Sequence, residues 1–598
     1  MKNWYEIGAK KDFLFVFLLM VFHYFVKGYS FGVDDQVLQI PLLKLSINPD
    51  LYPLDLLHSF TPYQFTYFFK VFGLLLPMDH SLEYLYFIGY LLSFGFAMLI
   101  FIKIATELVC RKESAYLAAV ILASGYYPTL PWAYFDSFFS HRTFAFPFFL
   151  ASIYLFLRHR YLLSLLLVGL VWNIHGLHSL HLTLIFLSSL WIQMKVLGWK
   201  KVLGLSILLF IPASPVILWR ILSLESFSLE PWRTMIKILA GNQLFPLSWP
   251  SNTPLRVGTF LLYLALALKS THLLERELRL FFSAILVMCL GGFLFSEIFP
   301  LRLMIEAQFM RSTVFFYLLS LPFVTHYLLV KNERGDLLTK MMVSLSIASF
   351  ISREVEFIFL PSLFFLMEEM FHAVRNLMRF RLILFLSILI GEVFFVLNGF
   401  GILGASLYRF NLLPKTILIF LTSFLALMVH LSLQKMIEEV KFSNSRLYLL
   451  VAIGVITGIS YSFLTHQSPV NLQESNWKDI QLWVKENTDR NESFITPIYL
   501  SGFRVYSERG VVVEWYDGFW GPFFSTELSV KWWERMKDFG ITEENFRDRE
   551  SVYSALREED FLKIGEKYRA SYVITLKPKI LQFKKLFENE KFFLYALP

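Results

Sequence analysis

Long apolar runs recur through the first 465 residues of this chain, and they constrain its fold more than any other feature. A helix needs about 20 apolar residues to cross a bilayer, and shorter or longer runs adapt by kinking or tilting. About fifteen runs come close to this length, and 56% of all residues are hydrophobic against 17% charged. The sequence therefore predicts a polytopic α-helical membrane protein. The predicted spans lie near residues 13–33, 82–104, 115–128, 142–157, 161–174, 177–194, 202–222, 255–269, 279–297, 312–330, 338–352, 355–373, 381–398, 413–434 and 446–465.

Lysine and arginine gather in short clusters between alternate spans, which explains the formal net charge of +8 without nucleic acid as a partner. Basic loops stay on the cytoplasmic side of a membrane. The pattern therefore predicts a multi-pass protein of the plasma (inner) membrane with a cytoplasmic N-terminus. The clusters include Lys10 and Lys11, Arg111 and Lys112, Arg158 and Arg160, Lys200 and Lys201, and Arg334 and Lys340.

Residues 61–77 form one further apolar segment, which we interpret as a helix lying along the membrane surface. The segment is short and carries Lys70 in its middle, and a crossing here would invert every later basic cluster. Residues 34–80 then form one long outer loop. The odd number of crossings predicts an extracytoplasmic C-terminus, with a transmembrane domain at 1–465 and an outer domain at 466–598.

The composition of residues 466–598 is that of a soluble domain, and its alternating helix and strand patterns predict a small α/β fold. No GxGxxG motif, phosphate-binding loop or metal-ligand spacing occurs in this tail, so we predict no independent catalytic centre there. Aromatic residues surround Arg504 in the run 503–524, which is typical of a sugar- or peptide-binding lip; the alternative is a sheet edge packed onto the membrane part. Helices are predicted at 477–487, 526–539 and 551–568, and strands at 493–498, 510–515, 571–576 and 592–597.

Asp34 and Asp35 follow the first predicted span directly, where the chain reaches water on the outer side. Two adjacent carboxylates repel, and such coupled acids often have one shifted pKa, which suits a catalytic acid or base. The alternative is that both residues only cap the helix that begins after them.

Most other unusual polar residues fall on the same predicted side as this pair. Ionisable groups near spans usually face a bundle interior or a wet cavity, so the set predicts a polar cavity open to the outer face. Three histidines at a spacing of three suit hydrogen bonding or phosphate contact, with metal ligation as an alternative, and the arginines alternatively snorkel to the interface. The candidate binding residues are His141, Arg142, His175, His178, Arg302, Arg311 and Arg504; we assign no metal ligands and leave a divalent cation open as a cofactor.

This layout resembles the GT-C superfamily of integral-membrane glycosyltransferases. The similarity covers the whole chain as a plan: one N-terminal helix, an acidic pair at the start of a long outer loop, many further spans and an outer soluble domain. The pair Asp34 and Asp35 matches the family's Asp-Asp type of motif. The chain lacks the WWDYG motif of the oligosaccharyltransferase branch, so transfer of a whole oligosaccharide to asparagine is not expected.

The resemblance implies transfer of a sugar from a polyprenyl-phosphate donor to a hydroxyl of a lipid, glycan or protein acceptor at the outer face of the bilayer. One aspartate would act as base, arginines would hold the phosphate leaving group, and the anomeric carbon would be inverted. Two competing classes are a transporter or flippase for a lipid-linked or polar solute, and a non-catalytic envelope assembly protein. A transporter is expected to have polar groups at mid-membrane and matching halves, which this sequence lacks.

Overall fold

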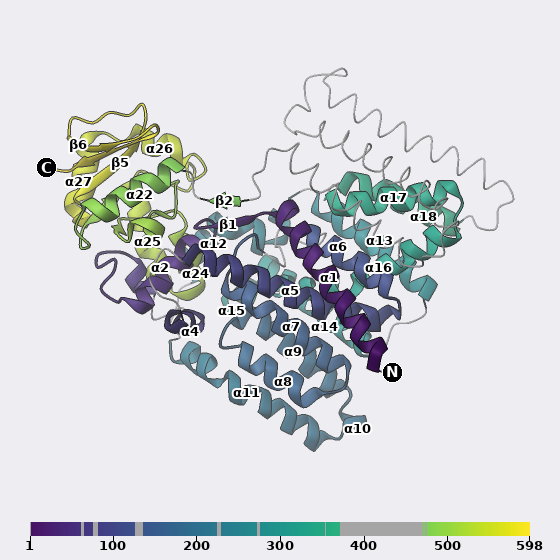
Figure 1. The fold of residues 1–598 in the computed structure, drawn as a ribbon. Coiled ribbons are helices and arrows are strands. Elements are labelled where there is room, and N and C mark those ends of the chain that lie inside the picture. Colours follow the sequence, from purple (N-terminus) through teal and green to yellow (C-terminus); the bar gives the residue numbers. More distant parts are fainter. Residues whose placement is uncertain are drawn as a thin grey trace.

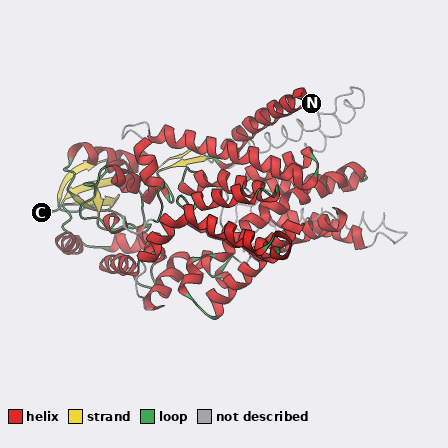
Figure 2. Ribbon diagram, turned by 90° about the horizontal axis from the view of Figure 1, so that it is seen from below, coloured by secondary structure: helices red, strands yellow, loops and turns green. Residues whose placement is uncertain are grey.

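A helical bundle with a small sheet domain at one end makes up the molecule (Figures 1 and 2). The computed structural model describes residues 2–60, 65–75, 82–125, 136–223, 229–250, 252–271, 276–352, 355–370, 470–472 and 475–598. The spans predicted at 381–398, 413–434 and 446–465 lie outside these residues.

The bundle buries a continuous apolar core between its helices and exposes apolar side chains on its outer surface. On α14, for example, Leu286, Val287 and Leu290 are each more than half exposed, as expected for side chains that face lipid. The bundle helices are α1 (Lys2–Lys27), α5 (Leu82–Val109), α6 (Lys112–Ser124), α7 (His141–Leu157), α8 (Tyr161–Val171), α9 (Gly176–Ile192), α10 (Met194–Leu197), α11 (Trp199–Leu222), α12 (Leu229–Leu244), α13 (Thr253–Thr271), α14 (Arg276–Phe293), α15 (Arg302–Glu306), α16 (Thr313–Arg334), α17 (Leu337–Ser352) and α18 (Val355–Met370).

Among the described residues, four helical stretches are long and apolar enough to cross a membrane. Several other apolar helices, including α7, α8 and α9, are shorter, at 10–17 residues. The fold is therefore a helical one with candidate membrane spans, and the number of about fifteen crossings stays a prediction. The four stretches are Leu82–Val109, Trp199–Leu222, Arg276–Ile298 and Arg302–Arg334.

The outer loop contains three helices, α2 (Gln36–Ile47), α3 (Leu57–Phe60) and α4 (Phe68–Leu75). In α4, Phe68 and Phe69 are buried whereas Leu74 is 89% exposed. With eight residues, α4 is about 12 Å long, too short to cross a membrane by itself.

The C-terminal domain has a five-stranded sheet in the order β4-β3-β5-β7-β6. β3 pairs in parallel with β4 and β5, and β7 pairs antiparallel with β5 and β6. Its elements are α22 (Ser475–Asn487), β3 (Ser493–Ile495), α23 (Phe503–Ser507), β4 (Gly510–Val511), α24 (Asp517–Phe524), α25 (Thr526–Asp538), α26 (Arg549–Ala555), α27 (Glu558–Tyr568), β5 (Tyr572–Leu576), β6 (Lys584–Glu588) and β7 (Phe592–Ala596).

Most of these elements agree with the sequence pattern, but α23 and α24 within the run 503–524 were not predicted. Three further differences have physical causes. The helix predicted at 551–568 is two helices, because Leu556 leaves the helical conformation with ψ 142°. β6 was not predicted, since its sequence KKLFE lies on a largely exposed edge and lacks an apolar face. The strand predicted at 510–515 is only two residues long, and it forms the opposite edge of the sheet.

Two short strands join the start of the outer loop to the start of the C-terminal domain. β1 (Tyr29–Phe31) pairs in parallel with β2 (Val470–Leu472), and Tyr29 lies opposite Val470. Any membrane topology must therefore place residues 29–31 and 470–472 on the same side. This proximity agrees with the even number of crossings predicted between them, since fourteen of the predicted spans follow the first one.

The outer loop and the C-terminal domain share one apolar core. Leu38 and Tyr52 from the loop belong to the same buried cluster as Trp532 and Met536 from α25. The tail is thus packed onto the loop that carries the acidic pair. The alternative interpretation of the run 503–524 had placed such a contact on the membrane part.

Candidate functional site

The acidic pair lies in a tight turn between β1 and α2. Gly32 and Asp34 both adopt left-handed backbone conformations, with φ of 72° and 51°. The buried side chain of Gln36 closes the turn, because its Oε1 accepts from the N–H of Gly32 at 2.9 Å and its Nε2 donates to the carbonyl of Phe139 at 2.8 Å. The turn is thereby fixed against the loop that precedes α7.

Asp35 occupies the N-cap position of α2 but makes no side-chain cap hydrogen bond. Its Oδ1 instead accepts a hydrogen bond of 2.8 Å from the hydroxyl of Tyr516, and its Oδ2 lies 3.7 Å from Nη2 of Arg142. The helix-capping alternative therefore does not describe Asp35. Its carboxylate faces a phenol from the C-terminal domain and a guanidinium from α7.

Arg142 reaches the pair from the first turn of α7. Ser140 caps this helix by accepting from the N–H of Thr143, and the guanidinium then forms a two-pronged ion pair with Asp136, from Nε at 2.9 Å and Nη2 at 2.5 Å. The sequence predicted that the Arg142 guanidinium binds phosphate, but Asp136 already accepts hydrogen bonds from two of its nitrogens. Within the described part of the chain, Nη1 of Arg142 donates no hydrogen bond.

Three carboxylates, two in this turn and Asp136 before α7, lie close enough to affect one another's charge. Asp34 is exposed, yet the surrounding protein raises the pKa of its carboxyl by desolvation, and the charges of Asp35 and Asp136 raise it further. Burial also raises the pKa of Asp136, although Arg142 opposes that shift. Of the three carboxylates, Asp34 is the one that combines an exposed side chain with a raised pKa.

Behind Arg142, four histidines from two helices form a continuous row. His141 of α7 stacks on His175 at 5.0 Å between ring centroids, and His175 stacks on His178 at 4.7 Å. His181 follows at 5.9 Å, and its Nε2 donates to the carbonyl of Ala307. The buried Nδ1 atoms of His141 and His178 have no hydrogen-bond partner among the described residues.

The stacked rings lie face to face and do not converge on a common point. Among the described residues, no group of three or more His, Cys, Asp or Glu is arranged to hold a metal ion. The row is therefore better suited to hydrogen bonding of a ligand than to ligation of a cation.

The remaining predicted arginines lie in two different surroundings. Arg311, in a short 3-10 helix at Phe309–Ser312, is within electrostatic range of Arg142, Asp35 and Asp136. Arg302 instead pairs with Glu306 at 2.6 Å, donates to Thr526 at 2.7 Å and covers the ring of Trp232. The structure places Arg311 within electrostatic range of the acidic turn and Arg302 at a contact between the bundle and α25.

Arg504 is fully buried, so it does not fit the expected binding role. It makes five hydrogen bonds of 2.7–3.3 Å to the carboxylates of Asp55, Glu514 and Asp517. Asp55 belongs to the outer loop, and it also accepts from the N–H of Val511 in β4. We call this buried ion cluster the Arg504 clamp; it attaches the edge of the sheet to the outer loop.

The clamp holds more negative than positive charge, which gives a testable pH dependence. Burial raises the pKa of Glu514 from 4.5 to about 7, although Arg504 opposes the shift. The folded protein binds more protons than the unfolded chain between these values, so the free energy of unfolding should fall as the pH rises from about 4.5 to 7, by up to about 3 kcal/mol. Glu514→Gln should flatten this slope in thermal unfolding measured against pH, and an unchanged slope would contradict the assignment. Glu527→Gln, at an exposed site in α25, is the matched control.

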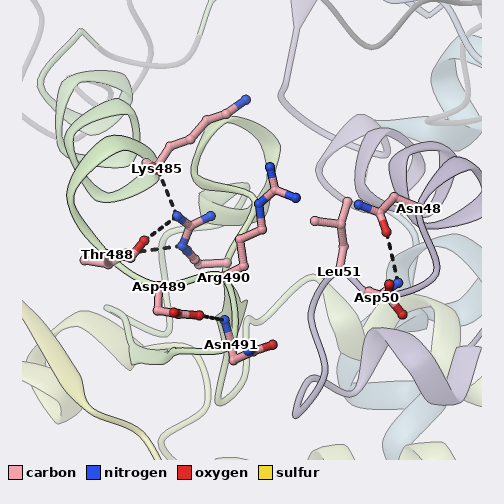
Figure 3. Close-up of a pocket in the computed structure, with 9 residues that line it drawn as sticks. Asn48, Asp50, Leu51, Lys485, Thr488, Asp489, Arg490 and Asn491 are labelled. Carbon is pink, nitrogen blue, oxygen red and sulfur yellow. Dashed lines mark hydrogen bonds between the residues drawn. The ribbon is translucent and has the colours of Figure 1, made fainter.

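A separate open pocket of about 560 Å³ lies between the outer loop and the C-terminal domain (Figure 3). It is found past the C-terminal end of α2, whereas Asp35 precedes the first residue of that helix. About 18 Å of helix separates the two places, so this pocket is not the surroundings of the acidic pair. Its lining residues are Asn48, Asp50, Leu51, Lys485, Thr488, Asp489, Arg490, Asn491 and Arg509.

Residues 475–539 match a family model described as a domain of unknown function, DUF6798. No curated protein matches the chain. The matched stretch contains Arg504, Glu514, Tyr516 and Asp517, so it includes every C-terminal residue described above at the clamp and at the acidic turn.

Sequence reasoning did not assign two residues of this site, Tyr516 and Asp136. Asp136 was visible as an acid in the same outer loop segment as Arg142, six residues earlier. Tyr516 stood within the aromatic and charged run 503–524, but only packing of the tail onto the outer loop brings its hydroxyl to Asp35.

Proposed function

We propose that this protein is a membrane glycosyltransferase that moves a sugar from a polyprenyl-phosphate donor to an acceptor hydroxyl, with inversion at the anomeric carbon. The observation that carries the proposal is the position of Arg142, 3.7 Å from the carboxylate of Asp35 beside a solvent-exposed Asp34. A base and a cation stand together there, next to the apolar bundle. This transfer requires both groups.

Asp34 is the proposed general base. The acceptor oxygen attacks the anomeric carbon and loses its proton, while the bond from that carbon to the phosphate oxygen breaks and the phosphate leaves with the electron pair. A base is most effective when its pKa approaches the working pH. The raised pKa of Asp34 moves it in that direction, and its exposure allows an acceptor hydroxyl to reach it.

The leaving phosphate is negatively charged and needs donors and cations to stabilise it. Arg142 offers Nη1, and Arg311 adds positive charge within range of the same turn. The row His141, His175 and His178 borders Arg142 and supplies further ring nitrogens. Together these residues support a phosphate position on the side of Asp35 that faces α7.

The non-catalytic alternative relied on the two aspartates being helix caps, and the absence of a cap bond from Asp35 disfavours it. Mass spectrometry of lipids that copurify with the protein tests the proposed class directly. Recovery of a polyprenyl phosphate or its sugar ester is the expected result. A protein that carries none, and that fails to bind added polyprenyl monophosphate at saturating concentration, would overturn the proposal.

Arg311→Ala should weaken binding of polyprenyl monophosphate by roughly 10- to 100-fold, the value of a lost charge-assisted contact. Binding is measured by titration of the lipid into protein in detergent. Arg302→Ala is the matched control, because Arg302 contacts Glu306 and Thr526 away from the turn. Equal affinity in the Arg311→Ala variant and the wild type would mean that Arg311 does not bind the phosphate and only reaches the membrane interface.

A further inference from the structure

Tyr516 is the residue through which the C-terminal domain reaches the acidic turn. It directly precedes α24, and its hydroxyl donates to Oδ1 of Asp35 at 2.8 Å. Burial, and then the charge of Asp35, raises the pKa of this phenol. The hydroxyl therefore keeps its proton and remains a donor throughout the physiological pH range.

The backbone around Tyr516 is held on both sides by the Arg504 clamp. Glu514 and Asp517 each accept from the Arg504 guanidinium, and Asp517 also accepts from the N–H of Glu514 at 3.0 Å. The indole of Trp532 donates to the carbonyl of Glu514 at 3.1 Å. The backbone at position 516 consequently has little freedom to move relative to the clamp.

The clamp itself is tied to the segment that carries the acidic pair. Arg504 bonds Asp55 through Nε and Nη2, at 2.7 and 2.8 Å, and Asp55 lies in the same outer loop as Asp35. Two of the contacts that join the loop to the domain are therefore linked through the backbone around Tyr516, namely the buried clamp and the Tyr516–Asp35 hydrogen bond. This arrangement does more than attach a domain, because the second joint ends on the candidate site.

We propose that the C-terminal domain completes the site, with Tyr516 as a positioning residue that orients the Asp35 carboxylate by donating a hydrogen bond to it. The catalytic meaning of this role rests on the proposed function, in which Asp35 assists Asp34. A phenol that donates to a carboxylate stabilises its charged form. An Asp35 carboxylate that is held in one orientation in turn favours proton uptake by Asp34 and the position of Arg142.

The charged and titratable groups around Asp35 come from every element packed against it. Removing only the phenol hydroxyl changes one donor and leaves the others in place, so its effect on Asp35 can be isolated. These groups are Asp34 in the turn, Asp136, His141 and Arg142 at α7, Arg311 in the 3-10 helix and Tyr516 before α24.

The test is the pH dependence of carbodiimide labelling of Asp35, because carbodiimides react with protonated carboxyls. Labelled full-length protein is digested, and tandem mass spectrometry separates modification of Asp35 from that of Asp34. Tyr516→Phe should raise the labelling midpoint of Asp35 by about one pH unit, the value of one lost hydrogen bond to a carboxylate at a partly exposed site. Replacing Tyr516 with difluorotyrosine, a stronger donor of the same shape, should lower the midpoint.

Tyr506→Phe is the matched control. Tyr506 lies in α23 of the same domain, and its hydroxyl donates to Glu83 of α5 at 2.7 Å, so this variant loses the same kind of bond at the same interface. It should leave the Asp35 midpoint unchanged. An unchanged midpoint in both Tyr516 variants, or an equal shift in Tyr506→Phe, would overturn the positioning role.

The labelling result does not depend on sugar transfer, so the two proposals fail separately. If the chain transfers no sugar but the Tyr516 variants shift the midpoint, only the proposed function is lost. If transfer is found and the midpoint does not move, only the role of Tyr516 is lost.

Discussion

The Asp34→Asn variant is expected to fold and to bind its donor, yet to transfer sugar roughly 10²- to 10⁴-fold more slowly than the wild type, as for the loss of a positioned base. Asparagine has the shape of aspartate and tolerates the left-handed backbone, φ 51°, that this position requires. The substitution therefore removes the base without straining the turn. The measurement is transfer from a polyprenyl-phosphate sugar, together with donor binding.

Asp35→Asn should have a smaller effect on transfer, because Asp35 is already bonded to Tyr516 and lies beside Arg142. Asp50→Asn is the control, since Asp50 is exposed in the same outer loop and lies beyond the far end of α2. Wild-type transfer by the double variant at positions 34 and 35 would remove the catalytic assignment of the pair.

Replacing Arg504 with methionine is expected to destabilise the protein by about 3–5 kcal/mol, because the change leaves buried carboxylates without their cation. Asp55, Glu514 and Asp517 are all fully buried around it. The separation of the tail from the outer loop should appear as a lowered thermal unfolding temperature and as new protease cleavage between the two. Arg504→Lys should recover only part of the loss, since an ammonium cannot make the five hydrogen bonds of the fork.

Lys531→Ala provides the comparison for this experiment. Lys531 pairs with Glu527 on the exposed face of α25, in the same domain, and such surface pairs contribute about 0–1 kcal/mol. If the Arg504 variant unfolded at the temperature of Lys531→Ala, the clamp would not be what holds the domain to the loop.

Local patterns accounted for the elements of this fold that have a strong apolar signature. The run at 82–104 became α5, and the amphipathic stretch at 477–487 became α22. These predictions succeed because a helix is stabilised by contacts within a few turns of its own sequence. The charged edge strand β6 has no such signature, and its pairing with β7 depends on the sheet already being present.

The residues of the candidate site were likewise only partly predictable from local sequence. The sequence alone determined that Asp34 and Asp35 follow the first apolar run, and that His175, His178 and His181 recur at a spacing of three. The helix α1 ends earlier than the predicted span, at Lys27, and β1 lies between it and the acidic pair. The sequence-based assignment of Arg504 to ligand binding did not hold, because an arginine among aromatics has the same local appearance at a binding surface and in a buried ion cluster.

Only the tertiary structure decided which distant groups meet. Asp55 and Arg504 are 449 positions apart, and Asp35 and Tyr516 are 481 positions apart. No local pattern encodes these contacts, because they form only when the apolar faces of the outer loop and the C-terminal domain bury each other in one core. That burial brings the Tyr516 phenol to the Asp35 carboxylate, and it encloses the Arg504 guanidinium among three other carboxylates. Tyr516 therefore lies at the candidate site, whereas Arg504 belongs to the contacts that hold the site in place.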